Sequence, residues 1–182
     1  SRSIEGEAVE LEHIAAGAGL SKGAVYLYFK SKEDMLRALI ERGVKRVARA
    51  VADRLDTDMG DPVRALKEAA DIFAQILSKP ELFVVPRIVI AEAGNFPEIA
   101  RLYRDEVIDV GKGALERLIE RGQAAGVFIQ MDPQVVVRSL IGPFIMQMIW
   151  RTTFERPGEE TLDPDALVEG HLKIVLNGLC TS

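Results

Sequence analysis

Three aspartate–proline pairs divide most of the sequence into helices. They lie at residues 61–62, 132–133 and 163–164. Aspartate is a favoured helix N-cap, and proline fits the first helical turn because its missing N–H removes no hydrogen bond there. Apolar residues follow each pair at spacings of three and four. The pattern therefore predicts helices over 62–78, 133–155 and 164–178.

The remaining chain after residue 30 also has helical periodicity. Ser31 and Asp34 resemble a capping box, and an apolar stripe continues from them to about residue 56. Two more helices are expected at about 81–94, kinked at Pro86, and at 97–124. Alternating β-branched runs bounded by turns are absent from the sequence. We therefore expect an all-α fold in which one rigid helix over 32–56, about 40 Å long, joins an N-terminal part to a helical body.

Charge is distributed unevenly along the 182 residues, whose formal net charge is -5. Residues 21–54 contain nine Lys or Arg and four acidic residues, whereas residues 55–182 contain thirteen basic and twenty acidic residues. A basic segment on an acidic body favours local contact with a polyanion. The alternative is a helix with an ordinary solvated basic face.

The N-terminal segment has the pattern of a helix-turn-helix motif. "LEHIAAG" (11–17) predicts a short helix, Gly19 suits a tight turn, and Ser21 caps a second short helix over about 22–28. Val25 and Phe29 supply the inward face of that second helix. In this motif the first residues of the second helix meet base edges in the major groove.

The outward residues of the second helix suit DNA. Lys22 can donate to guanine, Ala24 offers a methyl group to thymine, and Gly23 lets the backbone approach closely. The hydroxyl groups of Tyr26 and Tyr28 can reach phosphates, although partial burial as packing residues is the alternative.

Lys32 occupies an unfavourable position for a cation, in the first turn of the 32–56 helix. A phosphate held by backbone N–H groups and by Lys32 would remove that conflict. The predicted DNA contacts are therefore Ser21, Lys22, Gly23, Ala24, Tyr26, Tyr28 and Lys32.

The stretch "IAAGAGLSKGAVYLYFKSKEDML" (14–36) resembles the DNA-binding segment of tetracycline-repressor-type (TetR-family) transcriptional regulators. The resemblance implies a helix-turn-helix domain over 1–45 and a ligand-binding and dimerisation domain over 46–182. It also implies that residues 22–24 read bases and that Tyr26, Tyr28 and Lys32 contact phosphates. Thirteen residues precede Ile14, fewer than the family's first helix and turn require, so we expect residues to be missing after about Glu10.

A small, largely apolar effector is expected in the body. Segment 81–150 is rich in aromatic residues and methionine, and Pro86 and Pro143 should bend two helices and leave gaps between them. An ordinary aromatic-rich core is the alternative. The candidate effector-binding residues are Phe83, Arg87, Glu92, Phe96, Tyr103, Phe144, Gln147 and Met148.

The last two helices are apolar on more sides than one neighbour can cover. Paired with those of a second subunit they would form a four-helix interface, and its two-fold symmetry would suit a palindromic operator. Closure of the monomer core is the alternative. The candidate interface residues are Ile141, Ile145, Ile149, Leu172 and Val175.

Other classes of function lack their motifs. No arrangement of nucleophile and base, no glycine-rich phosphate loop and no HExxH motif is present, so we expect neither an enzyme nor a cofactor. The acidic residues between Glu92 and Asp109 lack a Glu-x-x-His partner and indicate a solvated face rather than a metal site. No run reaches the ~20 apolar residues of a membrane span, so we expect a cytoplasmic protein. The prediction is a ligand-responsive transcriptional repressor; a helical adaptor that binds protein instead of DNA is the alternative.

Overall fold

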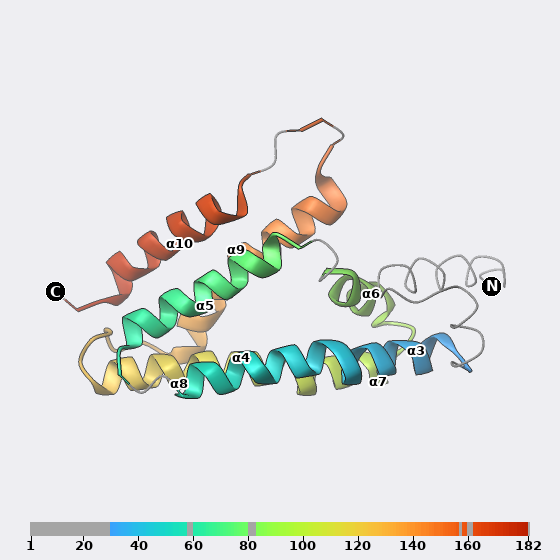
Figure 1. The fold of residues 1–182 in the computed structure, drawn as a ribbon, viewed down its shortest axis with the longest axis horizontal. Coiled ribbons are helices and arrows are strands. Elements are labelled where there is room, and N and C mark those ends of the chain that lie inside the picture. Colours follow the sequence, from blue (N-terminus) through green and yellow to red (C-terminus); the bar gives the residue numbers. More distant parts are fainter. Residues whose placement is uncertain (1–29, 58–59, 80–82, 157, 160–161, 182) are drawn as a thin grey trace. The chain divides into compact units, whose positions relative to one another are not determined.

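A computed structural model describes residues 30–57, 60–79, 83–156, 158–159 and 162–181 (Figure 1). The predicted helix-turn-helix lies outside them. Within them every regular element is helical, which confirms the all-α fold, and the β-type pairing is an isolated bridge between Phe128 and Cys180. The elements are α3 (Lys32–Leu39), η1 (Ile40–Val44), α4 (Lys45–Thr57), α5 (Pro62–Leu77), α6 (Val84–Glu92), α7 (Pro97–Tyr103), η3 (Arg104–Ile108), α8 (Asp109–Ala124), α9 (Pro133–Ile149), η4 (Trp150–Phe154) and α10 (Pro164–Leu179).

The helix starts follow from the capping residues. Asp61, Asp132 and Asp163 accept hydrogen bonds from backbone N–H groups of the first turns of α5, α9 and α10 at 2.9, 2.8 and 3.1 Å. Ser31 Oγ accepts the N–H of Asp34 at 3.1 Å and begins α3. All four predicted starts are confirmed.

Two details of the helices differ from the sequence-based expectation. Three segments named η1, η3 and η4 have the wider i→i+5 hydrogen-bond pattern of a π-helix, and each continues an α-helix. Pro86 lies in the first turn of α6, where it removes no helical hydrogen bond and gives no reason for a kink. Pro143 does lie inside a helix, α9.

The chain divides into two compact units. One comprises Ser1–Arg49 and Pro80–Val110, and the other comprises Ala50–Lys79 and Gly111–Ser182. The boundaries fall inside α4 and α8. The domain boundary predicted after residue 45 stays a prediction.

The second unit is built around α5, which packs along α10 and also contacts α9 (Figure 1). Four alanines lie on the buried face of α5 and let the neighbouring helices approach closely: Ala65, Ala69, Ala70 and Ala74. At the end of α8, Phe128 is 1% exposed and lies against Gly122, where a Cβ atom would stand 2.0 Å from the ring. This position requires glycine.

The first unit has a small core in which α3 packs against α6 and α7 (Figure 1). Leu36 and Ile40 meet Val89 and Ile99, all of them at most 4% exposed. No helix in the described ranges is long and apolar enough to span a bilayer.

Candidate functional site

Lys32 is the predicted DNA contact that the structure describes; residues 21–28 lie outside the described ranges. Its Nζ atom lies 3.1 Å from Oε1 of Glu92, the last residue of α6, and the two side chains are only 9% and 7% exposed. Nδ2 of Asn95 donates to the other carboxylate oxygen of Glu92 at 2.9 Å. The first turn of α3 and the end of α6 thus meet at a buried ion pair.

The buried Lys32–Glu92 pair bears on two predictions: the solvated acidic face and the phosphate at Lys32. Among the described residues, Glu92 is the one charged residue that is buried. The prediction that the acidic residues between Glu92 and Asp109 form a solvated face is therefore wrong for Glu92. Its carboxylate supplies the negative charge that a cation at the start of a helix requires. Sequence reasoning predicted a phosphate in that role and missed the internal partner, because Lys32 and Glu92 are sixty residues apart in the chain.

The other candidate effector-binding residues of the first unit have different environments. Phe83 is buried and Arg87 is exposed. Phe96 and Tyr103 are partly buried and pack against the core of that unit. Burial raises the pKa of Tyr103 to about 12, so its hydroxyl stays neutral and can donate a hydrogen bond.

In the second unit, Phe144 lies at the centre of an aromatic cluster. Its ring stacks on Phe73 at 5.0 Å and meets the edge of His171 at 5.4 Å. Nε2 of His171 lies 3.1 Å from the carbonyl oxygen of Leu140, so this half-buried ring has a backbone partner within the unit. The apolar cavity beside these rings has a volume of about 20 Å³, room for about one water molecule.

Gln147 and Met148 are half-buried on α9. The eight candidate effector-binding residues therefore fall into two groups: Phe83, Arg87, Glu92, Phe96 and Tyr103 in the first unit, and Phe144, Gln147 and Met148 in the second. Their common role in one effector site stays a prediction.

Two carboxylates near the surface, those of Glu106 and Asp56, form ion pairs with basic side chains. Glu106 lies 2.9 Å from both Lys45 and Arg49, and the hydrogen bond from Lys45 is the main cause that lowers its pKa. The pKa of Asp56 is lowered chiefly by its hydrogen bonds with Arg117, at 2.6 and 3.0 Å. These clusters attach neighbouring helices to one another within each unit. In the described ranges no group of His, Cys, Asp or Glu is placed to hold a metal ion.

The last two helices expose apolar side chains. Of the predicted interface residues, Ile145 is 46% exposed, whereas Ile141, Ile149, Leu172 and Val175 are half-buried. Other strongly exposed apolar side chains of these helices are not among the predicted interface residues. They are Val135, Met146 and Ile174, the last of them 73% exposed.

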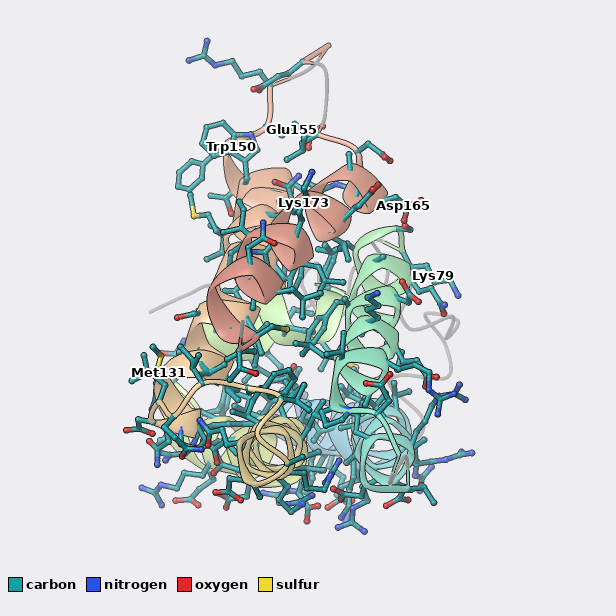
Figure 2. All side chains as sticks on the ribbon, turned by 90° about the vertical axis from the view of Figure 1, so that its left-hand side faces the viewer. Lys79, Met131, Trp150, Glu155, Asp165 and Lys173 are labelled. Atoms are coloured by element: carbon teal, nitrogen blue, oxygen red, sulfur yellow. The ribbon has the colours of Figure 1, made fainter. Side chains whose placement is uncertain are left out.

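The exposed apolar side chains continue to the end of α9. Trp150 and Phe154 follow it with their ring centroids 6.0 Å apart, and both are exposed. Figure 2 shows Trp150 and Met131 well apart, and in the sequence they flank the two ends of α9. The exposed apolar side chains therefore concentrate at the C-terminal end of α9 and just beyond it, with Val135 near the other end and the exposed Arg138 and Ser139 between.

Comparison with known proteins identifies related chains. Residues 7–39 match the family described as bacterial regulatory proteins, tetR family, and residues 56–164 match the one described as tetracyclin repressor-like, C-terminal domain. A curated relative, the HTH-type transcriptional regulator EthR of Mycolicibacterium smegmatis, is 34% identical over 65 residues. That match covers 36% of this chain and 30% of the relative, so it spans less than a third of the relative's length.

Solved structures with the same fold are also regulators. A ketosteroid transcriptional regulator of Mycobacterium tuberculosis, KstR2, has a TM-score of 0.65 at 22% identity, covering 100% of this chain and 97% of the other. A regulator of the TetR/AcrR family from Thermobifida fusca has a TM-score of 0.55 at 25% identity, with coverages of 92% and 85%. A flavonoid-responsive regulator, FrrA, has a TM-score of 0.55 at 24% identity, with coverages of 98% and 86%.

Proposed function

Because the chain belongs to the tetR family of bacterial regulatory proteins, which makes it a transcriptional regulator and not an enzyme, we propose that it is a ligand-responsive repressor. It binds a palindromic operator as a homodimer and releases it when a small hydrophobic molecule binds. The observation that carries the proposal is the family match over residues 7–39, since this range contains all seven predicted DNA contacts.

The operator is read by the second helix of the predicted motif. Lys22, Gly23 and Ala24 meet base edges, while Tyr26, Tyr28 and Lys32 contact phosphates. Selection of bound fragments from random or genomic DNA tests this role. A recovered palindrome supports the proposal, whereas no enrichment of any sequence contradicts it and favours a helical protein-binding adaptor.

The homodimer is supported by the apolar surface of α9 and α10. An exposed side chain such as Ile145 or Ile174 loses its contact with water when a second copy covers it. The other predicted interface residues lie on the same two helices and are half-buried: Ile141, Ile149, Leu172 and Val175. Sedimentation of a single monomeric species at micromolar concentration would rule the dimer out.

The effector is small and largely apolar. The candidate contacts are Phe83, Phe96 and Tyr103 in the first unit and Phe144 and Met148 in the second. Arg87 and Glu92 in the first unit and Gln147 in the second are the candidates that orient the polar end of the molecule. Two of the structural neighbours are a ketosteroid transcriptional regulator and a flavonoid-responsive regulator, and ketosteroids and flavonoids are molecules of this kind.

Release follows from linkage between the two binding events. Recognition helices must lie about 34–36 Å apart to enter successive major grooves, so a ligand that changes their spacing weakens DNA binding. A coupling of about 1–3 kcal/mol is sufficient, and DNA must weaken ligand binding by the same factor. The test is titration of hydrophobic compounds, cationic ones included, against the protein–DNA complex. A compound that binds the free protein tightly and leaves DNA affinity unchanged would contradict the ligand-gated mechanism.

A further inference from the structure

The Lys32–Glu92 pair is unusual for a predicted phosphate contact. A side chain that contacts DNA is expected to reach into solvent, yet the Lys32 side chain is 9% exposed and its Nζ atom lies 3.1 Å from a carboxylate of the same chain. The pair is neutral as a whole. In this arrangement the charge of Lys32 is already compensated before any DNA arrives.

Glu92 is held firmly in that position. Nδ2 of Asn95 donates to its second oxygen at 2.9 Å, and the backbone N–H groups of Asn95 and Phe96 donate to its carbonyl oxygen at 2.9 and 2.8 Å. The carboxylate is 7% exposed. Moving it away from Lys32 therefore means moving the end of α6, not rotating a surface side chain.

A carboxylate and a phosphate diester compete for the same partners. Both are anions that accept charge-assisted hydrogen bonds from an ammonium group, and both are favoured near the positive end of a helix such as α3. Lys32 is the first residue of α3 and follows its N-cap, Ser31. The position that would receive a DNA phosphate is thus adjacent to an anion that the chain itself supplies.

We propose that Glu92 is an internal competitor of the DNA backbone: it neutralises Lys32 in the DNA-free protein and must release it before Lys32 can contact a phosphate. This inference rests on the proposed function, because it assumes that Lys32 contacts DNA. Glu92 does not touch DNA itself; it lowers the affinity for DNA by holding Lys32.

The same pair gives the body a way to control the DNA-binding segment. Glu92 is the last residue of α6, and Val89 on the same helix packs against Leu36 and Ile40. Phe96 and Tyr103, two candidate effector-binding residues, pack against this cluster. A molecule that shifts α6 relative to α3 changes the distance between Glu92 and Lys32 and thereby changes how much of the charge of Lys32 is available to DNA.

The test removes the competing charge and retains the shape. Glu92→Gln keeps an amide oxygen for Lys32, and we expect it to tighten DNA binding by about five-fold or more, the lower end of ordinary coupling between sites. Glu106→Gln is the matched control. It makes the same change in net charge within the same unit, beside Lys45 and Arg49, and leaves Lys32 paired. The double variant Lys32→Gln/Glu92→Gln should lose the gain.

A second readout does not depend on DNA. Inorganic phosphate should raise the melting temperature of Glu92→Gln above its value in chloride of equal ionic strength. The wild type, Glu106→Gln and the double variant should lack this extra shift. Circular dichroism confirms that each variant is folded.

The outcomes separate the two proposals. If the wild type binds a selected operator and Glu92→Gln binds it with equal or lower affinity, competition is wrong and the proposed function stands. If no variant binds DNA and only Glu92→Gln responds to phosphate, the proposed function fails and competition with DNA fails with it, while competition between Glu92 and free phosphate for Lys32 stands. Absence of both effects in a folded Glu92→Gln protein overturns the inference.

Discussion

The contact between Gly122 and Phe128 allows a quantitative prediction of stability. A Cβ atom on residue 122 would lie 2.0, 2.3 and 2.8 Å from three ring atoms of Phe128, whereas carbon atoms in contact are about 3.5–4.0 Å apart. The ring would have to retreat by about 1.5 Å. It has little freedom to do so, because it is 1% exposed and its neighbours Val127 and Ile129 are hydrogen-bonded to Thr181 and Leu179 at 3.0 and 2.8 Å.

We therefore expect Gly122→Ala to destabilise the protein. Overpacking of this kind costs about 1–3 kcal/mol, and the tight surroundings of Phe128 place the cost near the upper end. The better helix propensity of alanine returns about 1 kcal/mol, which leaves a net loss of about 2 kcal/mol. Chemical denaturation measures the loss directly, and the melting temperature should fall by about 4–8 °C.

Two matched variants test the cause. Gly111 lies in the same helix, and a methyl group added there would have nothing within 4 Å, so Gly111→Ala should stabilise the protein by about 0.5–1 kcal/mol. In a Phe128→Ala background the space is vacated, and Gly122→Ala should then also become stabilising. A loss that persists in that background would refute the steric explanation.

Three further predictions address the dimer, the pH dependence and DNA recognition. A methyl group added at Gly170 on α10 would have nothing within 4 Å, so Gly170→Ala should stabilise the single chain by about 1 kcal/mol. It should also weaken the dimer if the partner packs there, which sedimentation at several concentrations would detect. The depressed pKa of Asp56 means that its pairing with Arg117 stabilises the fold above pH about 4, the unfolded value, and less as pH falls through the folded value. Asp56→Asn should therefore lower stability at pH 6 and make little difference at pH 2, as measured by urea denaturation at each pH. Lys22→Ala should cost about 1–3 kcal/mol at the preferred operator and much less on unrelated DNA, so equal losses in a binding assay on both would contradict base reading by Lys22.

Helix positions were predictable because their signals are local. An aspartate followed by proline determines where a helix starts through hydrogen bonds within three residues, and Asp61, Asp132 and Asp163 act in this way. The π-helical segments were not predictable for a related reason. An i→i+5 turn inserts one residue and hardly changes an apolar periodicity that spans several turns.

Contacts between distant residues were beyond sequence reasoning. Gly122 and Phe128 are close in the chain, yet Phe128 is also joined to a distant residue, Cys180, by an isolated β-bridge. The close contact between the ring and Gly122 could therefore not be read from the local sequence. Tyr103 gave no signal of burial, because tyrosines occur both in cores and on surfaces. The membership of the family was predictable, since it rests on a motif within twenty-three consecutive residues.

Lys32 shows that a sequence can reveal an unfavourable charge without revealing which group compensates it. A lysine in the first turn of a helix indicates that an anion lies nearby, because the helix dipole and the ammonium group repel each other. The sequence does not say which anion. In the structure the carboxylate of Glu92 removes the conflict, and a DNA phosphate would remove it equally well. The Glu92 carboxylate and a DNA phosphate cannot both make their full interaction with Lys32. The position of α6, which carries Glu92, therefore affects the affinity for DNA through Lys32.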